Sequence, residues 1–288
     1  MGNLEIFRQG MKKSDWYLLI LYAAIVACLV IRIHAEATHY ISPDSAFYLK
    51  VSENILAGKG AVVPKCYPFT CEEETFFAFW SLGYPFAIML VHLVTGLGLF
   101  WASKVVNFIA LAAIFILLRK IGTDKAYLPA FIFCSYPMLE VFSYSWSEPL
   151  FLCTSLYFIV FVFEIFNQIN TSNAVNSFHW LSLFVLLTAL FLVRYAGLIY
   201  FILTGIISLY FLVRKNYQMF FRFILVLLCS SMVVFAYFWN NHRLTGYVTG
   251  GYRIAPEQES VTEFLTYLFR GTFNMFFVIR YNYFKAGL

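Results

Sequence analysis

Asp44 is the residue of this sequence whose type and position could do chemistry most directly. It lies in the stretch 42–45, Ser-Pro-Asp-Ser, just after the first long apolar run. Ser42 suits a helix cap and Pro43 a first helical position. Apolar residues then recur every four positions: Phe47, Val51 and Ile55. The pattern predicts an amphipathic helix along a membrane surface that begins with a carboxylate, which is either a general base or an acid that the helix dipole favours.

Glu148 is a second carboxylate in a similar position. It precedes Pro149 at the start of a later apolar run. Glutamate is an ordinary residue at a helix start, because the helix dipole favours it there. Two carboxylates that face each other across a cleft can also hold a metal ion or an acceptor hydroxyl. We therefore take Glu148 as a candidate catalytic residue beside Asp44.

Arg194 lies at the end of the apolar run 181–193. An ionisable residue at such a place marks a site or a buried pair, unless its side chain reaches out to the lipid headgroups. The planar guanidinium matches a phosphate group in geometry and charge. The sequence therefore offers Arg194 as a ligand for an anionic lipid headgroup.

Further candidates follow the last long apolar run. Arg243 lies at its end, and a glycine-rich bend, 245–251, leads into Tyr252 and Arg253. Such a bend could close over a ligand, although glycines in a loop are a weak signal. The acidic run 72–74 is most simply a solvated charge cluster.

The composition sets the class of protein that must position these residues. Of the 288 residues, 61% are hydrophobic and 12% charged, whereas about a quarter are charged in soluble proteins. Several apolar runs approach or reach the roughly 20 residues that cross a bilayer. The basic residues behind the net charge of +5 cluster at the ends of these runs and give no indication of nucleic acid binding. We expect an all-α polytopic membrane protein.

Six cysteines fall into two groups. Four lie inside apolar runs and are most simply small core residues: Cys28, Cys134, Cys153 and Cys229. Cys66 and Cys71 share one polar loop, and their spacing fits no common zinc pattern. They are either a disulfide in an oxidising outer compartment or two free thiols.

Seven segments are expected to span the membrane. They are 17–34, 101–118, 126–143, 150–167, 178–195, 197–213 and 219–239. The apolar run 82–100 is ambiguous, because it contains proline and several glycines. The stretch 261–284 carries Arg270 near its middle and is expected to lie in the interface.

The basic residues decide how 82–100 is interpreted. If it crosses the membrane, six of them fall outside: Arg119, Lys120, Lys125, Arg214, Lys215 and Arg222. If it lies in the interface or dips in and returns, they join the N-terminal basic residues on the cytoplasmic side, as the positive-inside rule prefers. The second interpretation places all the charged candidates on one outer face: Asp44, Glu148, Arg194, Arg243 and Arg253.

The expected architecture is a single transmembrane domain over residues 1–288. A long first outer loop, about 35–100, carries the amphipathic and interfacial segments. A short second outer loop covers about 143–149, and the outer segment 240–288 follows the last span.

Four short motifs occur in order along this frame. They are Asp44 with Tyr48-Leu49 and Gly58-Lys59-Gly60, then Trp80-Ser81-Leu82-Gly83-Tyr84-Pro85, then Glu148-Pro149, and last Arg194 to Gly197. As a set they resemble the GT-C superfamily of membrane glycosyltransferases, specifically the protein-mannosyltransferase and aminoarabinose-transferase-like group (glycosyltransferase family 39-like). The family's paired prolines in the second motif are replaced here by Ser81 and Leu82.

The resemblance implies roles for residues of this chain. Asp44 matches the family's general base, and Arg194 with the outer loops, including Arg243 and Arg253, would hold the phosphate of a polyprenyl-linked sugar donor. Tyr48, Tyr84 and Tyr252 are our expected substrate contacts. Many relatives have an acidic pair where this chain has Asp44-Ser45, so a divalent metal stays open and no cofactor is assigned. Many relatives also continue beyond the point matching Leu288, so we expect a minimal or truncated catalytic module.

The expected function is therefore sugar transfer from a polyprenyl-phosphate donor to an acceptor glycan, lipid or protein. The reaction would take place on the outer face of a bilayer, in a bacterial inner (plasma) membrane, with inversion at the anomeric centre. The alternatives are a lipid or solute carrier and a non-catalytic subunit whose site has decayed. The intramembrane arginine would suit a carrier, but no second copy of the 82–100 pattern is found.

Overall fold

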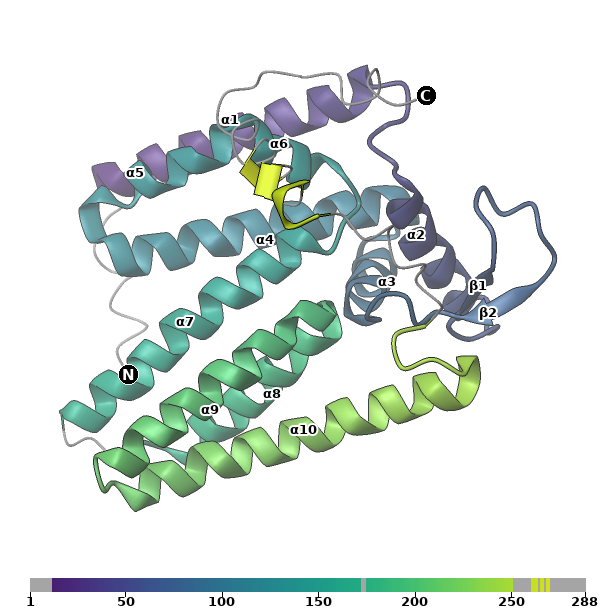
Figure 1. Cartoon of the computed structure of the whole chain (residues 1–288). Helices are drawn as coiled ribbons and strands as arrows, with labels where there is room; N and C mark the ends of the chain where they lie inside the picture. Colours follow the sequence, from purple (N-terminus) through teal and green to yellow (C-terminus); the bar gives the residue numbers. More distant parts are fainter. Residues whose placement is uncertain (1–11, 172–174, 251–259, 264, 267, 270–288) are drawn as a thin grey trace.

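The structure is a computed structural model that describes residues 12–171, 175–250, 260–263, 265–266 and 268–269 (Figure 1). Tyr252 and Arg253 and most of the predicted interfacial stretch 261–284 lie outside these residues. The longer helices are α1 (Lys13–Ala35), α4 (Leu99–Gly122), α7 (Glu148–Asn170), α8 (Ser177–Val193), α9 (Leu198–Val213) and α10 (Tyr217–Thr245). The shorter ones are α2 (Pro43–Leu56), α3 (Gly83–Thr95), α5 (Tyr127–Ala130) and α6 (Tyr136–Ser143). Short 3-10 turns are η1 (Thr123–Lys125), η2 (Phe131–Cys134) and η3 (Tyr195–Gly197).

Within the described residues, 5 helices are long and apolar enough to cross a membrane. They are α1, α4, α7, α10 and the continuous stretch of η3 and α9. Helix α8 is apolar but shorter, at 17 residues, and α3 has 13. The prediction of a helical integral membrane protein is confirmed, whereas the part of the chain that the structure describes does not contain seven long spans.

The predicted span 126–143 is wrong as a single helix. The chain forms α5, then η2, and becomes extended at Ser135 before α6 begins. Pro137 lacks the amide that would donate to the carbonyl of Phe133, and Pro129, about two helical turns earlier, lacks its amide as well. The broken segment nevertheless packs along α1 from one end of the bundle to the other (Figure 1).

Helix α3 occupies most of the run 82–100. It ends at Gly96, which has the left-handed φ of +71° of a helix C-cap. A helix of this length extends roughly 20 Å, and it packs against α2 and α4 (Figure 1). The end of α1 lies beside the start of α4, where the ring centroids of His34 and Trp101 are 5.3 Å apart. That the run 82–100 does not cross the membrane stays a prediction.

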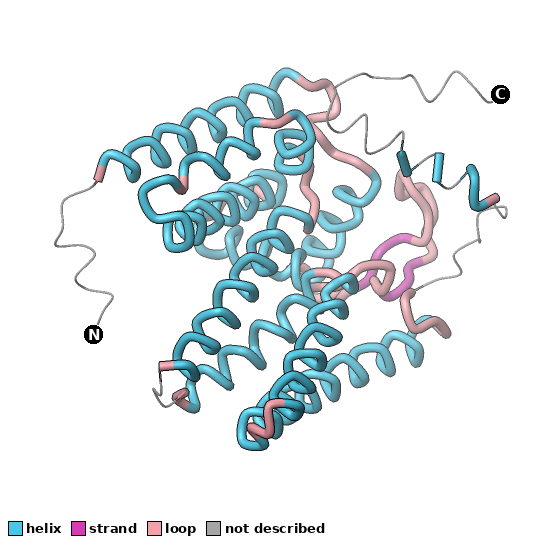
Figure 2. The backbone as a smooth tube through the Cα atoms, turned by 60° about the vertical axis from the view of Figure 1, so that its left-hand side comes forward, coloured by secondary structure: helices cyan, strands magenta, loops and turns pink. Residues whose placement is uncertain are grey.

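A short antiparallel hairpin lies beside α2. Strand β1 (Val62–Pro64) pairs with β2 (Glu74–Phe76) in the register Val62 with Phe76. Figure 2 shows these strands in magenta beside the helices that make up most of the molecule. We call the end of the bundle that carries α2, α3 and this hairpin the hairpin end.

The opposite end collects positive charge, and we call it the basic end. Its cations are Lys12, Lys13, Arg119, Lys120, Lys125, Arg214, Lys215 and Arg222. Ion pairs of Arg119 with Asp15 and of Lys120 with Glu164 join α1, α4 and α7 there. The hairpin end carries cations as well, among them Lys50, Lys59, Lys65, Arg194 and Arg243, so the orientation of the bundle stays a prediction.

Three apolar cores hold the elements together. One lies among α7, α8, α9 and α10, and a second among α1, α4 and the broken segment. The third joins α2, α3, the hairpin and the start of α4, with Tyr48 and Tyr84 at its centre. This third core fixes the elements that carry the candidate site.

Candidate active site

Asp44 lies in the first turn of α2, as its sequence context predicts. Ser42 caps the helix, since its Oγ accepts a hydrogen bond from the amide of Ser45 at 3.2 Å. The same oxygen accepts a second hydrogen bond from Nε1 of Trp146 at 2.7 Å. The start of α2 is therefore attached to the loop between α6 and α7.

The carboxylate of Asp44 is half-buried and forms no hydrogen bond or ion pair with any described residue. Burial raises its pKa above the ordinary value, and the negative charge of Glu148 raises it further. The positive charge of Arg194 opposes both effects. A carboxylate with a raised pKa and free oxygens is the arrangement expected of a general base.

Glu148 and Arg194 form an ion pair across the hairpin end. Glu148 begins α7, and Arg194 follows the last residue of α8, where the backbone becomes extended. Nη1 of Arg194 also donates to Oγ of Ser147 at 3.2 Å. Both side chains of the pair keep about a third of their surface exposed, 36% and 31%. A ligand at this end could therefore reach the guanidinium.

Tyr48 lies one helical turn after Asp44 and is 2% exposed. Its hydroxyl lies 3.1 Å from Oγ of Ser147, the same oxygen that Arg194 contacts. Burial raises the pKa of Tyr48 well above its ordinary value, so the phenol stays neutral. Tyr48 thus joins α2 to the Glu148–Arg194 pair.

Tyr84 is fully buried behind Tyr48, with their ring centroids 5.1 Å apart. Its hydroxyl hydrogen bonds to Oδ1 of Asn107 on α4 at 3.2 Å. In this arrangement Tyr84 supports the ring of Tyr48 rather than offering its own surface to a ligand.

Gly83, from the second motif, explains how α3 reaches the end of α8. A Cβ at this position would lie 2.5 Å from the carbonyl oxygen of Leu192 and 2.9 Å from the amide nitrogen of Val193. Only glycine permits this approach of two backbones. The start of α3 is thereby packed against the residues just before Arg194.

The remaining predicted residues are placed less closely. Arg243 is exposed in the last turn of α10 and forms no ion pair with a described residue. Its role as a phosphate ligand stays a prediction, as do the roles of Tyr252 and Arg253, which lie outside the described residues.

The loop between α6 and α7 holds residues that the sequence reasoning missed. Ser143, Ser145 and Ser147 are fully buried and alternate with Tyr144 and Trp146, which are partly exposed. The two aromatic rings stack with centroids 4.1 Å apart. Small and aromatic residues alternate from the end of α6 to the start of α7, and this alternation in the sequence could have been recognised as one buried and one partly exposed side.

The loop between β1 and β2 contains Cys66 and Cys71, which form a disulfide. The rings of Tyr67 and Phe69, inside the disulfide loop, pack on Phe47 of α2 with centroids at 6.3 and 5.1 Å. The acidic run behaves as a solvated cluster at Glu73, whose ion pair with Lys65 lowers its pKa.

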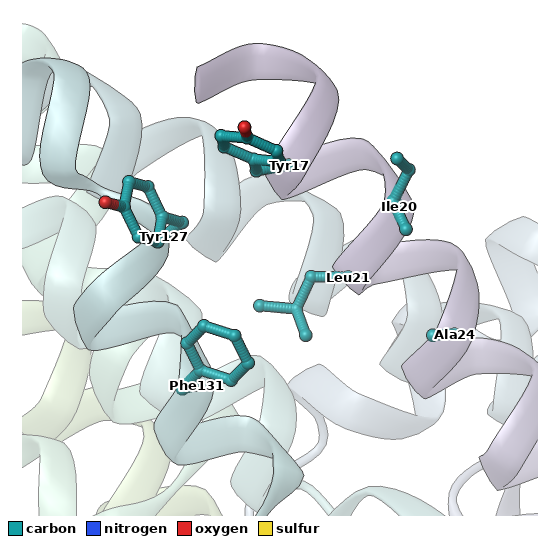
Figure 3. Close-up of a pocket in the computed structure, with 6 residues that line it drawn as sticks. All are labelled: Tyr17, Ile20, Leu21, Ala24, Tyr127 and Phe131. Atoms are coloured by element: carbon teal, nitrogen blue, oxygen red, sulfur yellow. The ribbon is translucent and has the colours of Figure 1, made fainter. Parts of the chain in front are cut away.

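The described residues contain no group of three or more histidine, cysteine, aspartate or glutamate side chains that could hold a metal ion. A pocket of about 500 Å³ lies elsewhere, between α1 and the broken segment (Figure 3). It is lined by Tyr17, Ile20, Leu21, Ala24, Tyr127 and Phe131. These residues are close to the basic end and include no carboxylate, histidine or cation, whereas the charged candidates lie at the hairpin end.

The geometry thus brings Asp44, Tyr48, Glu148 and Arg194 together from three helices that lie far apart in the sequence. No family model, curated protein or solved structure matches this chain, so the site is interpreted from its own residues.

Proposed function

We propose that this chain is a membrane glycosyltransferase. It would move a sugar from a polyprenyl-phosphate donor to an acceptor glycan, lipid or protein at the outer face of the membrane. The proposal is supported chiefly by one observation: Asp44 is a half-buried carboxylate with no partner among the described residues, close to the Glu148–Arg194 pair.

Asp44 acts in this mechanism as the general base. It takes the proton from an acceptor hydroxyl or amine as that group attacks the anomeric carbon of the donor sugar. The bond from this carbon to the phosphate oxygen breaks, and polyprenyl phosphate leaves with the electron pair. Direct displacement of this kind inverts the configuration at the anomeric carbon.

Arg194 stabilises the phosphate of the donor and of the departing product. Its Nη1 is occupied by Glu148 and Ser147, while Nε and Nη2 have no hydrogen-bond partner among the described residues. Those donors are the ones that a phosphate would use. Glu148 holds the guanidinium in position, and Arg243 and Arg253 are further phosphate ligands in this proposal.

The remaining parts of the proposal concern position and orientation. The basic end would lie at the cytoplasmic surface, as the positive-inside rule prefers, and the site would face outwards. The disulfide in the hairpin suits an oxidising outer compartment. Tyr48 and Tyr252 would border the substrate, and whether a divalent metal takes part is left to experiment.

The test is turnover by the purified protein with a panel of radiolabelled polyprenyl-phosphate sugars and candidate acceptors. Wild type should release polyprenyl phosphate from at least one donor, and Asp44→Asn should not, while its thermal unfolding and donor binding stay near wild type. Near-normal turnover by Asp44→Asn would remove Asp44 from the mechanism.

A carrier is the second candidate, because one observation favours it. Segment 127–143 is a discontinuous helix, and transporters use discontinuous helices to build their binding sites. Transport of an intact lipid-linked sugar across a vesicle membrane without release of polyprenyl phosphate would favour the carrier. Loss of both activities in a folded protein would favour a non-catalytic subunit.

A further inference from the structure

Lys104 is a buried lysine for which the proposed mechanism has no use. It lies five residues, roughly 8 Å, from the start of α4 at the hairpin end. Its side chain is 0% exposed, and it forms no ion pair with any described residue. A lysine in such a place is costly, so it is retained for a function or for a specific structural contact.

The contact that Lys104 makes is with the backbone at the end of α6. Its Nζ donates to the carbonyl oxygen of Ser143 at 2.7 Å. The last carbonyls of a helix have no partner within the helix, so a donor from another helix can satisfy one of them. Lys104 therefore caps α6 from a neighbouring helix.

Neighbouring residues on the same face of α4 extend this contact along the chain. Nδ2 of Asn107 donates to the carbonyl oxygen of Tyr144 at 2.7 Å, and also to that of Phe142 at 3.3 Å. Oγ of Ser103 lies 2.7 Å from Oγ of Ser145. One face of α4 thus supplies partners for polar groups that the connection between α6 and α7 would otherwise leave unpaired inside the bundle.

The far end of that stretch carries the candidate site. Ser147 contacts both Tyr48 and Arg194, and Glu148 pairs with Arg194. The stretch 143–147 is therefore held to α4 at its start and to the site residues at its end.

We propose that Lys104 is a positioning residue of the Asp44, Glu148 and Arg194 centre. By fixing the carbonyl of Ser143, it sets where Ser147 and Glu148 hold the guanidinium. This inference rests on the proposed function for its effect on turnover, but the effect on the stretch 143–147 is independent of it.

Two variants of Lys104 separate positioning from general stability. Lys104→Met keeps the length of the side chain but removes the donor, whereas Lys104→Gln keeps an N–H donor. Lys65→Met is the control, since Lys65 is an exposed lysine at the same end. Each protein is purified whole, and its hydrogen exchange at 143–148, thermal unfolding and turnover are measured.

We expect Lys104→Met to speed exchange at 143–148 and to leave exchange in α8, α9 and α10 unchanged. Its kcat should fall by about tenfold or more, because a small displacement of catalytic groups has effects of that order. Lys104→Gln should recover part of both losses, and Lys65→Met should behave as wild type. If Lys104→Met does not fold, Lys104→Gln is compared directly with wild type, and it should show the same two changes at smaller size.

Unchanged exchange at 143–148 in the folded variant would overturn the proposal, as would a wild-type kcat in Lys104→Met. If wild type itself turns over no donor, the proposed function fails. The exchange data would then still decide whether Lys104 holds the stretch that carries Ser147 and Glu148.

Discussion

The hydroxyl oxygens of Tyr48 and Ser147 lie 3.1 Å apart, although 99 residues separate them in the sequence. Both side chains are buried. The contact joins α2, which carries Asp44 in its first turn, to the N-cap residue of α7, the helix that begins with Glu148. Through Ser147 it extends to Arg194, so that the candidate base and the candidate phosphate ligand share one support.

The pH dependence of turnover should report on the charges around Asp44. Its pKa is raised by burial and by Glu148 and lowered by Arg194. Glu148→Gln should therefore move the acidic limb of the kcat/KM profile to lower pH, and Arg194→Gln should move it to higher pH. Both shifts are measured from kcat/KM against pH in stopped assays at matched ionic strength. If the acidic limb has the same midpoint in wild type and both variants, Asp44 is not the group whose titration limits kcat/KM.

The free energy of unfolding should also depend on pH through the raised pKa of Asp44. Because the pKa of Asp44 in the folded state is above its ordinary value of 3.8, the folded state holds the proton more tightly than the unfolded state. This contribution to stability is complete below that value and is lost as the pH rises through the raised pKa. Asp44→Asn should therefore be at least as stable as wild type at pH 7. Thermal unfolding from acid to neutral pH tests this, and a marked loss at pH 7 would contradict it.

Binding of polyprenyl phosphate should depend on Arg194. A lost charge-assisted hydrogen bond costs about 1.5–3 kcal/mol, which corresponds to roughly a ten- to a hundredfold weaker Kd for Arg194→Gln. Arg243→Gln is the matched comparison, since Arg243 is exposed and unpaired among the described residues, and it should weaken binding less. An equal loss in both variants would place the phosphate nearer to the end of α10.

Gly83 should tolerate no side chain. A Cβ there would meet the backbone at Leu192 and Val193, so Gly83→Ala must displace the end of α8 or the start of α3. Overpacking of this kind costs about 1–3 kcal/mol. Gly98→Ala is the control, because a Cβ at that position has nothing within 4 Å. Thermal unfolding of both variants measures the loss of stability in Gly83→Ala relative to Gly98→Ala. Equal stability of the two variants would show that α3 and α8 are not packed in this way.

The orientation of the bundle should be visible in the reactivity of Cys66 and Cys71. In a protein whose other four cysteines are replaced by serine, an impermeant maleimide should label intact cells only after reduction with an impermeant phosphine. A Lys215→Cys variant at the basic end should need permeabilised cells, provided that the hairpin pair is also replaced by serine. The opposite pattern would reverse the proposed topology.

Local signals in the sequence predicted much of the fold. Ser42 and Pro43 mark the start of α2, and apolar length predicts α1, α4, α7 and α10, because both depend on neighbours along the chain. The broken segment 127–143 was missed. There the apolar content outweighed the two prolines, whose effect on the backbone decides whether one helix can form.

The sequence predicted only that the charged candidate residues lie on the same outer face of the bundle. Charge asymmetry placed Asp44, Glu148 and Arg194 at the same end, but it could not pair Glu148 with Arg194 or identify the support that Ser147 gives. Those contacts depend on how α7 and α8 pack, which involves residues far apart in the sequence. Arg243 lies at the same end of the bundle but forms no ion pair with a described residue. The pattern of apolar residues in the sequence does not distinguish Arg243 from Arg194 in this respect.

Oγ of Ser42 accepts two hydrogen bonds, and this has a consequence for how α2 responds to a ligand. Its single oxygen caps α2 and also receives the indole N–H of Trp146, so both of its lone pairs are committed. A ligand that tilts the indole must therefore loosen the first turn of α2 or leave a donor unsatisfied. Binding of a ligand against the Trp146 ring would therefore change the orientation of the Asp44 carboxylate. The two are connected through Oγ of Ser42, and no domain needs to move.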